Sequence, residues 1–465
     1  MKHLRSATLV FWAAALPLAA CSQAPALTTF PVGATTVTVS ALATNLNTVW
    51  ELVWGPDNYI WMTERYGRIS RVDPATGQVQ ALLTLPDVTP TGESGLLGLA
   101  LHPQFAISPY VYVVYNYTAS GALREKLVRY TYSAAAGTLT APLVLLGNID
   151  ATTSHSGSRL LVLADGTLLM TTGDAQQQPQ AQNTASLNGK ILRLNLDGSI
   201  PANNSIAGSP VYTFGHRNPQ GLVQLPDGSL YSSEHGPAND DEINKIEPGR
   251  NYGWPNVEGY CNLAAEATFC AANNVREPLT TWTPTIAPAG LTYYNHPAIP
   301  DWRGGLLLAV LKNATLLHLP LAAGGQAVGT STGYLSTFGR LRAICVSPQG
   351  KVYLGTSNRD GRGAPVATDD RILVLENRAY VPSAARAENK PAFDIFPNPA
   401  RRQATVRLPV VATHLAISDL AGHVVRTLQP AGLETELDLN GLRAGTYLVQ
   451  VESHAGRATR KLVLE

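Results

Sequence analysis

The short hairpin that decides the fold reads Pro226-Asp227-Gly228-Ser229-Leu230-Tyr231-Ser232-Ser233. An apolar strand leads into its Pro-Asp-Gly turn, and the strand that leaves the turn ends in small hydroxyl-bearing residues. The same plan recurs at 56–63, 164–171 and 348–355, and two looser units fall at 96–132 and 285–321. Strands at intervals of roughly 40–60 residues, with almost no helical periodicity between them, predict an all-β fold, a β-propeller with about six blades.

A propeller makes a geometric prediction about function. The innermost strands of its blades converge on one axis, so side chains at equivalent places in different repeats face a shared floor. Polar residues at such places, far apart in the sequence, are therefore expected to point at one pocket: His155, Arg217, His235, Lys312 and Arg340.

Composition excludes several partners. The chain has 465 residues with 34 Lys+Arg against 33 Asp+Glu, a formal net charge of +1. Only 14 % of its residues are charged, against about 25 % in ordinary soluble domains. A balanced charge gives no field to attract nucleic acid or an anionic membrane, and 45 % hydrophobic residues argue against disorder.

The N-terminus predicts export. A basic start precedes the apolar stretch 7–20, which is shorter than the ~20 residues of a membrane-spanning helix. We therefore expect a signal peptide over residues 1–26. The residues up to Cys21 resemble a lipoprotein cleavage box, which favours lipidation there, while conventional cleavage after Ala24 or Ala26 stays open.

The cysteines fit an oxidising compartment. Cys261 and Cys270 bracket a short polar loop of the kind that a local disulfide closes. Cys345 then has no partner, and its apolar surroundings predict a buried strand thiol. No Cys-x-x-Cys or His-Glu-x-x-His spacing occurs, which argues against a zinc site.

The repeat pattern divides the chain. It predicts a propeller over residues 28–379, and the Ala- and Pro-rich residues 380–391 indicate a linker. In residues 392–465 apolar and polar residues alternate, which predicts a small antiparallel β-sandwich. The alternating stretches are 405–408, 414–418, 423–427, 445–451 and 460–465.

Three polar features could carry chemistry. His155 enters one strand of a repeat hairpin and Asp174 leaves its partner, so the two are expected to lie close together, as a general base and its orienting carboxylate. Arg217 offers a planar fork to a carboxylate or quinone oxygen. The acidic loop 233–242 could supply oxygens to calcium, although a solvated turn would have the same composition.

Short motifs in a fixed order add a family resemblance over about residues 49–375. Together they resemble the soluble quinoprotein glucose dehydrogenase and aldose sugar dehydrogenase family. The resemblance implies a six-bladed propeller that binds pyrroloquinoline quinone (PQQ) and calcium, oxidises the anomeric carbon of an aldose to a lactone, and passes electrons to an external acceptor. The motifs lie at 92–103, 154–159, 189–199, 215–221, 240–244 and 251–255.

The resemblance also implies roles for single residues. His155 matches the base that takes the anomeric hydroxyl proton, Asp174 its orienting carboxylate, and Arg217 the guanidinium beside the quinone carbonyl. Glu93 matches a substrate position. Three cations from two adjacent repeats match the partners of the cofactor carboxylates: Lys312, Arg340 and Arg342. Asn218 and Thr285 match further contacts of the cofactor.

The resemblance places calcium ligands as well. The backbone carbonyls of Gly236 and Pro237 match those that hold the calcium of the cofactor, and Glu242 and the Tyr252 backbone match a second, structural calcium site. This chain departs from the glucose-specific branch at Ser154, Glu93 and His235. Those differences favour the aldose branch of broad specificity.

The tail resembles the C-terminal sorting domain of type IX secretion. It opens with Pro-Asn-Pro at 397–399, has Asp-x-x-Gly at 419–422 and Gly-x-Tyr at 445–447, and ends in a basic strand. The resemblance implies that the secretion machinery is a partner and that the chain is secreted or held at the cell surface. A carbohydrate-binding accessory sandwich is the alternative, which the scarcity of aromatic residues disfavours.

Two other functions remain open for the propeller. One is a sugar- or protein-binding module without activity, and the other is a calcium-dependent lactonase. The joint presence of His155, Asp174, Arg217 and Lys312 speaks against a silent module, and a lactonase has no need of the three cofactor cations.

Overall fold

The computed structural model describes residues 24–382, 393–408, 412–419, 423–430, 432–453 and 456–465, in two compact units, Met1–Ala379 and Tyr380–Glu465. Most of the predicted signal peptide, Cys21 and most of the predicted linker lie outside the described residues. Strands dominate both units, and α1 (Ala264–Asn273) is the one α-helix of the described part. The all-β prediction is confirmed.

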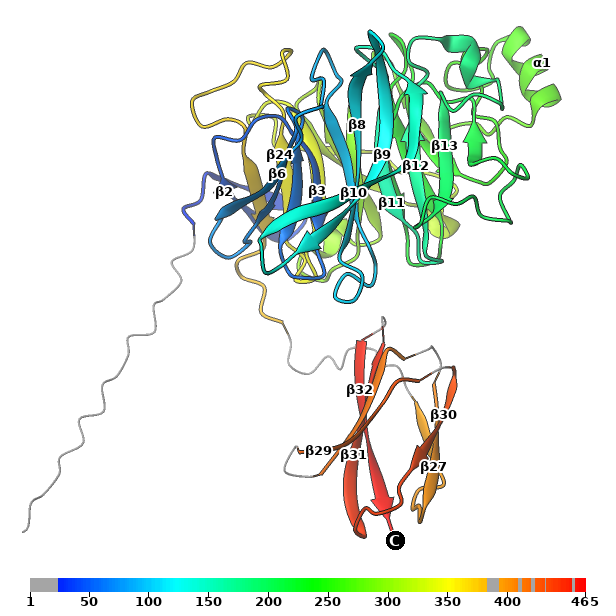
Figure 1. Cartoon of the computed structure of the whole chain (residues 1–465). Helices are drawn as coiled ribbons and strands as arrows, with labels where there is room; N and C mark the ends of the chain where they lie inside the picture. Colours follow the sequence, from blue (N-terminus) through cyan, green and yellow to red (C-terminus); the bar gives the residue numbers. More distant parts are fainter. Residues whose placement is uncertain (1–23, 383–392, 409–411, 420–422, 431, 454–455) are drawn as a thin grey trace, which may run out of the picture. The chain divides into compact units, whose positions relative to one another are not determined.

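The first unit contains six antiparallel sheets, coloured from blue to yellow in Figure 1. Five of them have four strands in sequence order. They are β3 (Val49–Trp54), β4 (Ile60–Glu64), β5 (Arg68–Val72) and β6 (Val79–Thr84); β7 (Leu96–Leu101), β8 (Tyr110–Ala119), β9 (Ala122–Ser133) and β10 (Thr138–Asp150); β11 (Gly157–Val162), β12 (Thr167–Thr172), β13 (Lys190–Asn195) and β14 (Val211–Phe214); β15 (Pro219–Gln224), β16 (Leu230–Glu234), β17 (Asp241–Ile246) and β18 (Thr280–Trp282); and β19 (Pro288–Tyr294), β20 (Gly305–Val310), β21 (Thr315–Pro320) and β22 (Thr332–Tyr334).

The sixth sheet joins the two ends of this unit. Its order is β1-β2-β25-β24-β23, from the strands β1 (Thr28–Val32), β2 (Thr35–Ala43), β23 (Leu341–Val346), β24 (Val352–Thr356) and β25 (Ile372–Glu376). Val39 of β2 pairs with Leu375 of β25. The first strand of each four-stranded sheet, and β23 of the sixth sheet, contact one another in the cyclic order β3, β7, β11, β15, β19, β23 and back to β3. This closed arrangement is consistent with a propeller.

The turns of the repeated hairpins follow from their sequence. In the hairpin of β15 and β16, the Asp227 carboxylate accepts the Ser229 amide at 2.9 Å, and Gly228 takes a φ of 87°. Glycine is the residue that reaches this left-handed region without strain. Asp165 accepts the Thr167 amide in the same way, also at 2.9 Å. Local side-chain chemistry therefore sets the register of each hairpin.

The core lies between neighbouring sheets. One cluster packs Ile60 and Met62 of β4 against Tyr353 of β24 and Ile372 of β25, all 2 % exposed or less. Every residue of β4 is buried, as expected for a strand covered on both faces. Such strands are rigid supports, and polar side chains that follow their ends are held in place by the packing.

The second unit has two antiparallel sheets, of orders β26-β27-β30 and β29-β28-β31-β32. A cluster that includes Phe393, Val406, Leu415 and Leu462 fills its interior. Sequence alternation predicted most of its strands but missed the short strands β26 and β30. The bounds are β26 (Asp394–Phe396), β27 (Gln403–Arg407), β28 (His414–Ser418), β29 (Val424–Leu428), β30 (Glu434–Asp438), β31 (Gly445–Ser453) and β32 (Gly456–Leu464).

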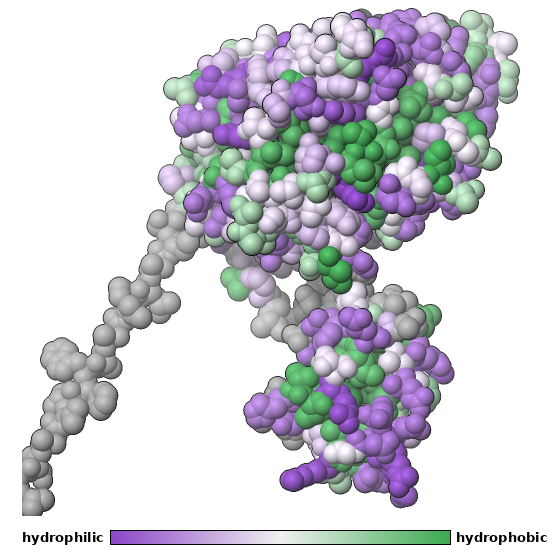
Figure 2. All heavy atoms as spheres, viewed as in Figure 1, coloured by the Kyte–Doolittle hydropathy of each residue, from purple (hydrophilic) through white to green (hydrophobic). Residues whose placement is uncertain are grey.

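The surface of the first unit includes an apolar region. Figure 2 shows apolar residues gathered across the middle of the face that it displays. Strand β10, at the outer edge of its sheet, exposes Leu143 and Val144. Among the described residues, no helix is long and apolar enough to cross a membrane.

Candidate active site

The candidate residues share one place in the architecture. Each precedes the first strand of a sheet or follows the second strand, and these two positions meet at the same end of an antiparallel pair. Segments far apart in the sequence therefore contribute to one end of the first unit. The residues are Arg65, Glu93, His155, Asp174, Arg217, His235, Thr285, Lys312, Arg340 and Asp360.

The predicted pair of His155 and Asp174 is in contact. The Nδ1 atom of His155 lies 2.8 Å from Oδ1 of Asp174. The imidazole side chain is 17 % exposed and the carboxylate is fully buried. His155 stands before β11 and Asp174 follows β12, so the hairpin itself brings them together, as the sequence predicted.

Backbone conformation is what allows this contact. His155 has a φ of 59°, in the left-handed region that side chains other than glycine rarely adopt. A Cβ atom on Gly173 would collide with the carbonyl oxygen of His155. Position 173 must therefore be glycine if the turn that carries the imidazole is to pass this close to the neighbouring strand.

Asp174 is held as a carboxylate by its donors. Burial alone would raise its pKa, but hydrogen bonds from His155, from the Gln176 amide and from Trp254 Nε1 outweigh burial and lower that pKa below its ordinary value. The Gln176 amide and Trp254 Nε1 both donate at 2.8 Å. An ionised carboxylate can only accept, so Nδ1 of His155 carries the proton and Nε2 of the neutral ring keeps a free lone pair.

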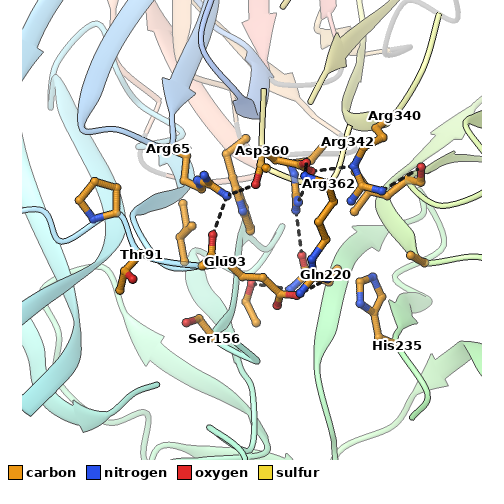
Figure 3. A pocket seen from close by; sticks show the side chains of 18 of the residues that line it. Arg65, Thr91, Glu93, Ser156, Gln220, His235, Arg340, Arg342, Asp360 and Arg362 are labelled. Atoms are coloured by element: carbon orange, nitrogen blue, oxygen red, sulfur yellow. Dashed lines mark hydrogen bonds and ion pairs between the residues drawn. The ribbon is translucent and has the colours of Figure 1, made fainter. Parts of the chain in front are cut away.

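A cavity of about 450 Å³ lies beside this pair. Figure 3 shows arginines from several sheets along one side of it, with Ser156 and His235 on the other. Its lining holds four arginines and two carboxylates, an excess of cations in a chain of nearly neutral charge. Those side chains are Arg65, Arg340, Arg342, Arg362, Glu93 and Asp360.

Asp360 organises the arginine side. One of its oxygens, Oδ2, lies 2.8 Å from Nε of Arg340 and 3.8 Å from an Nη of Arg342. Burial opposes ionisation, but these two guanidiniums lower the pKa of Asp360. Burial also lowers the pKa of Arg342 to about 10. Arg65 donates to the carbonyl of Gly92 at 2.7 Å, so the cluster is fixed by several elements at once.

His235 is a neutral group in the cavity wall. Burial lowers its pKa to about 4, against the opposing charge of Glu93. Its Nε2 lies 2.9 Å from the carbonyl oxygen of Pro288, an acceptor, and therefore carries the proton. Its Nδ1 is thus a hydrogen-bond acceptor in a wall otherwise rich in donors.

Two buried donors next to the cavity have no partner in the structure. Asn218 is 1 % exposed and its Oδ1 accepts the Gly157 amide at 3.1 Å, yet its Nδ2 makes no hydrogen bond. Arg217 donates from Nη1 to the carbonyl of His235 at 3.1 Å and lies 5.3 Å from the ring centre of Trp254, while its Nε makes none. Buried donors are rarely left unpaired, so both fit a site built for a further acceptor.

The predicted calcium segment lines a second, smaller space of about 20 Å³. A Cβ on Gly236 would collide with the carbonyl of Asn239, so this loop turns tightly. Burial and the neighbouring carboxylate of Glu234 raise the pKa of Glu242 well above its ordinary value. Tyr252 also lines this space. Within the described residues, no group of three or more His, Cys, Asp or Glu side chains is clustered as metal ligands, although calcium can also take backbone carbonyl oxygens.

The prediction that five residues face one pocket holds for only some of them. His235 and Arg340 line the cavity, together with Glu93 and Arg342. His155 lies beside the lining residue Ser156, and Arg217 lines the smaller space because its guanidinium turns toward the His235 carbonyl. The exposed Lys312 follows the lining residue Leu311 and donates to Thr285 Oγ1 at 3.0 Å.

The cysteines lie away from this cavity. Cys261 and Cys270 form a disulfide whose Cα atoms are 6.4 Å apart, at the helix α1. Cys345 is a free thiol, buried in β23.

Sequence reasoning missed part of the site. Arg65 comes two residues after the repeat hairpin 56–63, and Asp360 and Arg362 belong to a charged, glycine-rich loop after the repeat hairpin 348–355. The position after each repeat hairpin was therefore a sequence signal from which these residues could have been predicted. Trp254 stood in a quoted motif, but its contact with Asp174 joins two different sheets and has no signature in sequence spacing.

Comparison with known families gives two matches. The family described as glucose/sorbosone dehydrogenase matches residues 46–372, and the secretion system C-terminal sorting domain matches residues 394–465. The chain is 42 % identical over 266 residues to quinoprotein glucose dehydrogenase B of Acinetobacter calcoaceticus, covering 50 % of this chain and 56 % of that relative. The chain therefore spans little more than half the length of this relative.

Two further similarities each cover 70 % or more of the chain. The chain is 30 % identical over 349 residues to an aldose sugar dehydrogenase of Escherichia coli, covering 70 % of this chain and 91 % of the relative. The solved PQQ-bound form of aldose sugar dehydrogenase from Streptomyces coelicolor is similar with a TM-score of 0.64 and 35 % identity, covering 73 % of this chain and 98 % of that one.

Proposed function

The chain belongs to the glucose/sorbosone dehydrogenase family, and we propose that it oxidises aldose sugars at the anomeric carbon to lactones, with PQQ and calcium as cofactors and an external electron acceptor. One observation carries the proposal: an imidazole held by a buried carboxylate adjoins a cavity whose wall is rich in arginine. The imidazole suits an uncharged hydroxyl substrate, and the arginines suit an anionic quinone.

The residues present fit PQQ, a quinone with several carboxylates. Arg340 and Arg342 are the proposed partners of those carboxylates, with Lys312 and Thr285 at the edge of the cavity. The unpaired Nδ2 of Asn218 is a ready donor to the same group. PQQ bound here would supply an acceptor for the hydride of the sugar, and calcium would supply Lewis-acid polarisation.

His155 is the proposed base. Asp174 accepts its Nδ1 proton, so Nε2 is free to take the proton of the anomeric hydroxyl as the C–H bond breaks. The imidazole must be neutral for this role.

Arg217 and the adjoining loop complete the proposed site. The unpaired Nε of Arg217 is placed to donate to a quinone oxygen, because Trp254 and the His235 carbonyl hold its guanidinium. The proposed ligands of the cofactor calcium are the carbonyls of Gly236 and Pro237, and those of a structural calcium are Glu242 and the Tyr252 backbone. Carbonyl and carboxylate oxygens are the ligands that calcium prefers.

The architecture supports finer proposals. We interpret the six sheets of the first unit as six blades over residues 28–379, and the two sheets within 392–465 as a sandwich. The sorting-domain match supports export through type IX secretion. Lipid attachment at Cys21 is a separate proposal that rests on the leader sequence alone.

One experiment separates the proposed activity from a silent binding module and from a lactonase. The cofactor-free protein receives PQQ and calcium, and reduction of an artificial dye is followed with a panel of aldoses. Sugar-dependent reduction that needs both PQQ and calcium supports the dehydrogenase. Lactone hydrolysis without dye reduction indicates a lactonase, and sugar binding without either reaction indicates a binding module.

A further inference from the structure

An ion pair crosses the mouth of the cavity. Arg362 Nη1 lies 2.9 Å from Glu93 Oε1, with the arginine side chain 65 % exposed and the carboxylate 25 % exposed. Glu93 stands before β7, and Arg362 lies in the loop between β24 and β25. Figure 3 shows the long side chain of Arg362 reaching toward Glu93 across the cavity. The pair therefore joins loops of two different sheets.

Glu93 connects this pair to the base. Its Oε2 accepts the backbone amide of His155 at 3.3 Å, and its own amide donates to the carbonyl of Thr153 at 2.7 Å. The carboxylate is thus fixed between the turn that carries the imidazole and the guanidinium of Arg362. Its charge acts directly where a sugar would approach His155.

Arg362 differs from the other arginines of the lining. Arg65, Arg340 and Arg342 are held at the far wall by carbonyls and by Asp360. The backbone of Arg362 is anchored through its amide, which donates to Asp360 at 2.9 Å, but its guanidinium reaches into the exposed mouth. Removing the charge of Arg362 should therefore change the net charge at the mouth of the cavity and leave the other three arginines in place.

We propose that Glu93 and Arg362 form a charge-balanced specificity pair that keeps the mouth of the sugar site neutral and so selects uncharged aldoses over sugars that carry a charge. The proposal rests on the proposed function, because it requires a sugar in this cavity. A lone carboxylate would attract an ammonium group on the sugar and repel a carboxylate, and a lone guanidinium would do the reverse. The pair cancels both effects.

Three sugars that differ only at carbon 6 test the pair: glucose, glucuronic acid and 6-amino-6-deoxyglucose, at a pH where the amine is protonated. The variants are Arg362→Gln, Glu93→Gln and the double variant. Arg359→Gln is the matched control, because Arg359 lies in the same loop, is exposed, and does not line the cavity. The measurement is kcat/KM for each charged sugar relative to glucose.

Opposite shifts are expected from the two single variants. Arg362→Gln should raise the relative kcat/KM of the amino sugar by about tenfold, and Glu93→Gln should raise that of glucuronic acid by a similar factor. The double variant should return near the wild type, and Arg359→Gln should change neither ratio. A merely structural role would lower all rates together. Unchanged ratios in enzymes that still oxidise glucose would overturn the specificity pair.

A second readout needs neither cofactor nor sugar. Two charged side chains contact His155: Asp174 lies at its Nδ1, and Glu93 accepts its backbone amide. Without Arg362 the carboxylate of Glu93 loses its ion-pair partner, so Arg362→Gln should shift the NMR signal of the His155 amide, which donates to Glu93, in the cofactor-free protein, and so should Glu93→Gln. A His155 amide signal that neither variant shifts would contradict the coupling. Failure of the wild type to oxidise any sugar would overturn the proposed function instead.

Discussion

The two sides of the cavity are each organised by one buried carboxylate, with different results. Asp174 accepts hydrogen bonds from one imidazole, one amide and one indole, and within the described residues no guanidinium forms an ion pair with it. Asp360 pairs with Arg340 and lies near Arg342, so cations outnumber it. The pKa of each carboxyl is lowered, against burial, by its partners.

The groups around each buried carboxylate therefore determine its role in the site. On the base side the negative charge of Asp174 fixes the tautomer of His155 and leaves Nε2 free for a proton. On the arginine side the negative charge of Asp360 holds guanidiniums in place without neutralising all of them, which leaves a wall suited to an anion. Substitutions on the two sides should therefore separate turnover from cofactor affinity.

The largest expected effect is on the base side. His155→Asn removes the proton acceptor and should lower kcat by about 10²–10⁴-fold, the usual contribution of a positioned general base. The affinity for PQQ should stay near that of the wild type, because the arginine wall is untouched. Steady-state kinetics and a PQQ titration measure the two quantities. A loss of PQQ affinity with normal turnover at saturating PQQ would show that His155 binds the cofactor and is not the base.

The next effect is on the arginine side. Arg340→Gln removes a cation from the cavity and should weaken PQQ binding by about 100-fold, as for a charge-assisted contact. Turnover of the fully loaded enzyme should change little. Arg371→Gln is the control, because Arg371 also pairs with an aspartate, Asp369, but does not line the cavity. Equal PQQ affinity in both variants would count against the arginine wall as the cofactor site.

A smaller effect tests how firmly Asp174 is held. Trp254→Phe keeps a ring near Arg217 but removes the indole donor, which lies 2.8 Å from Asp174. The carboxylate stays ionised at neutral pH, so we expect a loss of only about tenfold in kcat, from a less well oriented imidazole. Asp174→Asn should lose more, because an amide can no longer accept at both positions. An equal loss in both would mean that the indole contributes as much as the charge.

A last prediction concerns a carboxyl behind the turn of His155. Glu125 is 2 % exposed, accepts Ser158 Oγ at 2.9 Å, and burial raises its pKa to about 8. The folded state thus keeps a proton that the unfolded chain releases from its ordinary pKa upward. The stability contribution of Glu125 is full below that ordinary pKa and is lost as the pH rises through about 8.

Glu125→Gln cannot titrate, so its stability relative to the wild type should rise with pH across this window, by at most about 1.4 kcal/mol per pH unit, and then level off. Urea unfolding of the full chain between pH 5 and pH 9 measures the difference. A constant difference over this range would mean that Glu125 is ionised in the folded protein. That result would make the two buried carboxyls of the base side alike.

Contacts between residues close in the sequence were predictable, and contacts between residues far apart in the sequence were not. The hairpin turns depend on an Asp and a Gly next to each other, and His155 meets Asp174 because they end the same hairpin, so spacing alone predicted both. The sheet that pairs Val39 with Leu375 and the contact of Trp254 with Asp174 join segments whose proximity depends on the closed fold. Arg362 and Glu93 likewise meet across two sheets, which no local pattern indicates.

The proposed activity requires that one cavity combine a sugar-activating base with a bound quinone. A single-turnover experiment tests it most directly: the protein is loaded with PQQ and calcium, mixed with excess glucose without any external acceptor, and the absorbance of the bound quinone is followed. We expect reduction of the bound quinone with one sugar oxidised for each loaded site, and a far slower change in His155→Asn. Bound PQQ whose absorbance no aldose alters would contradict the proposed activity.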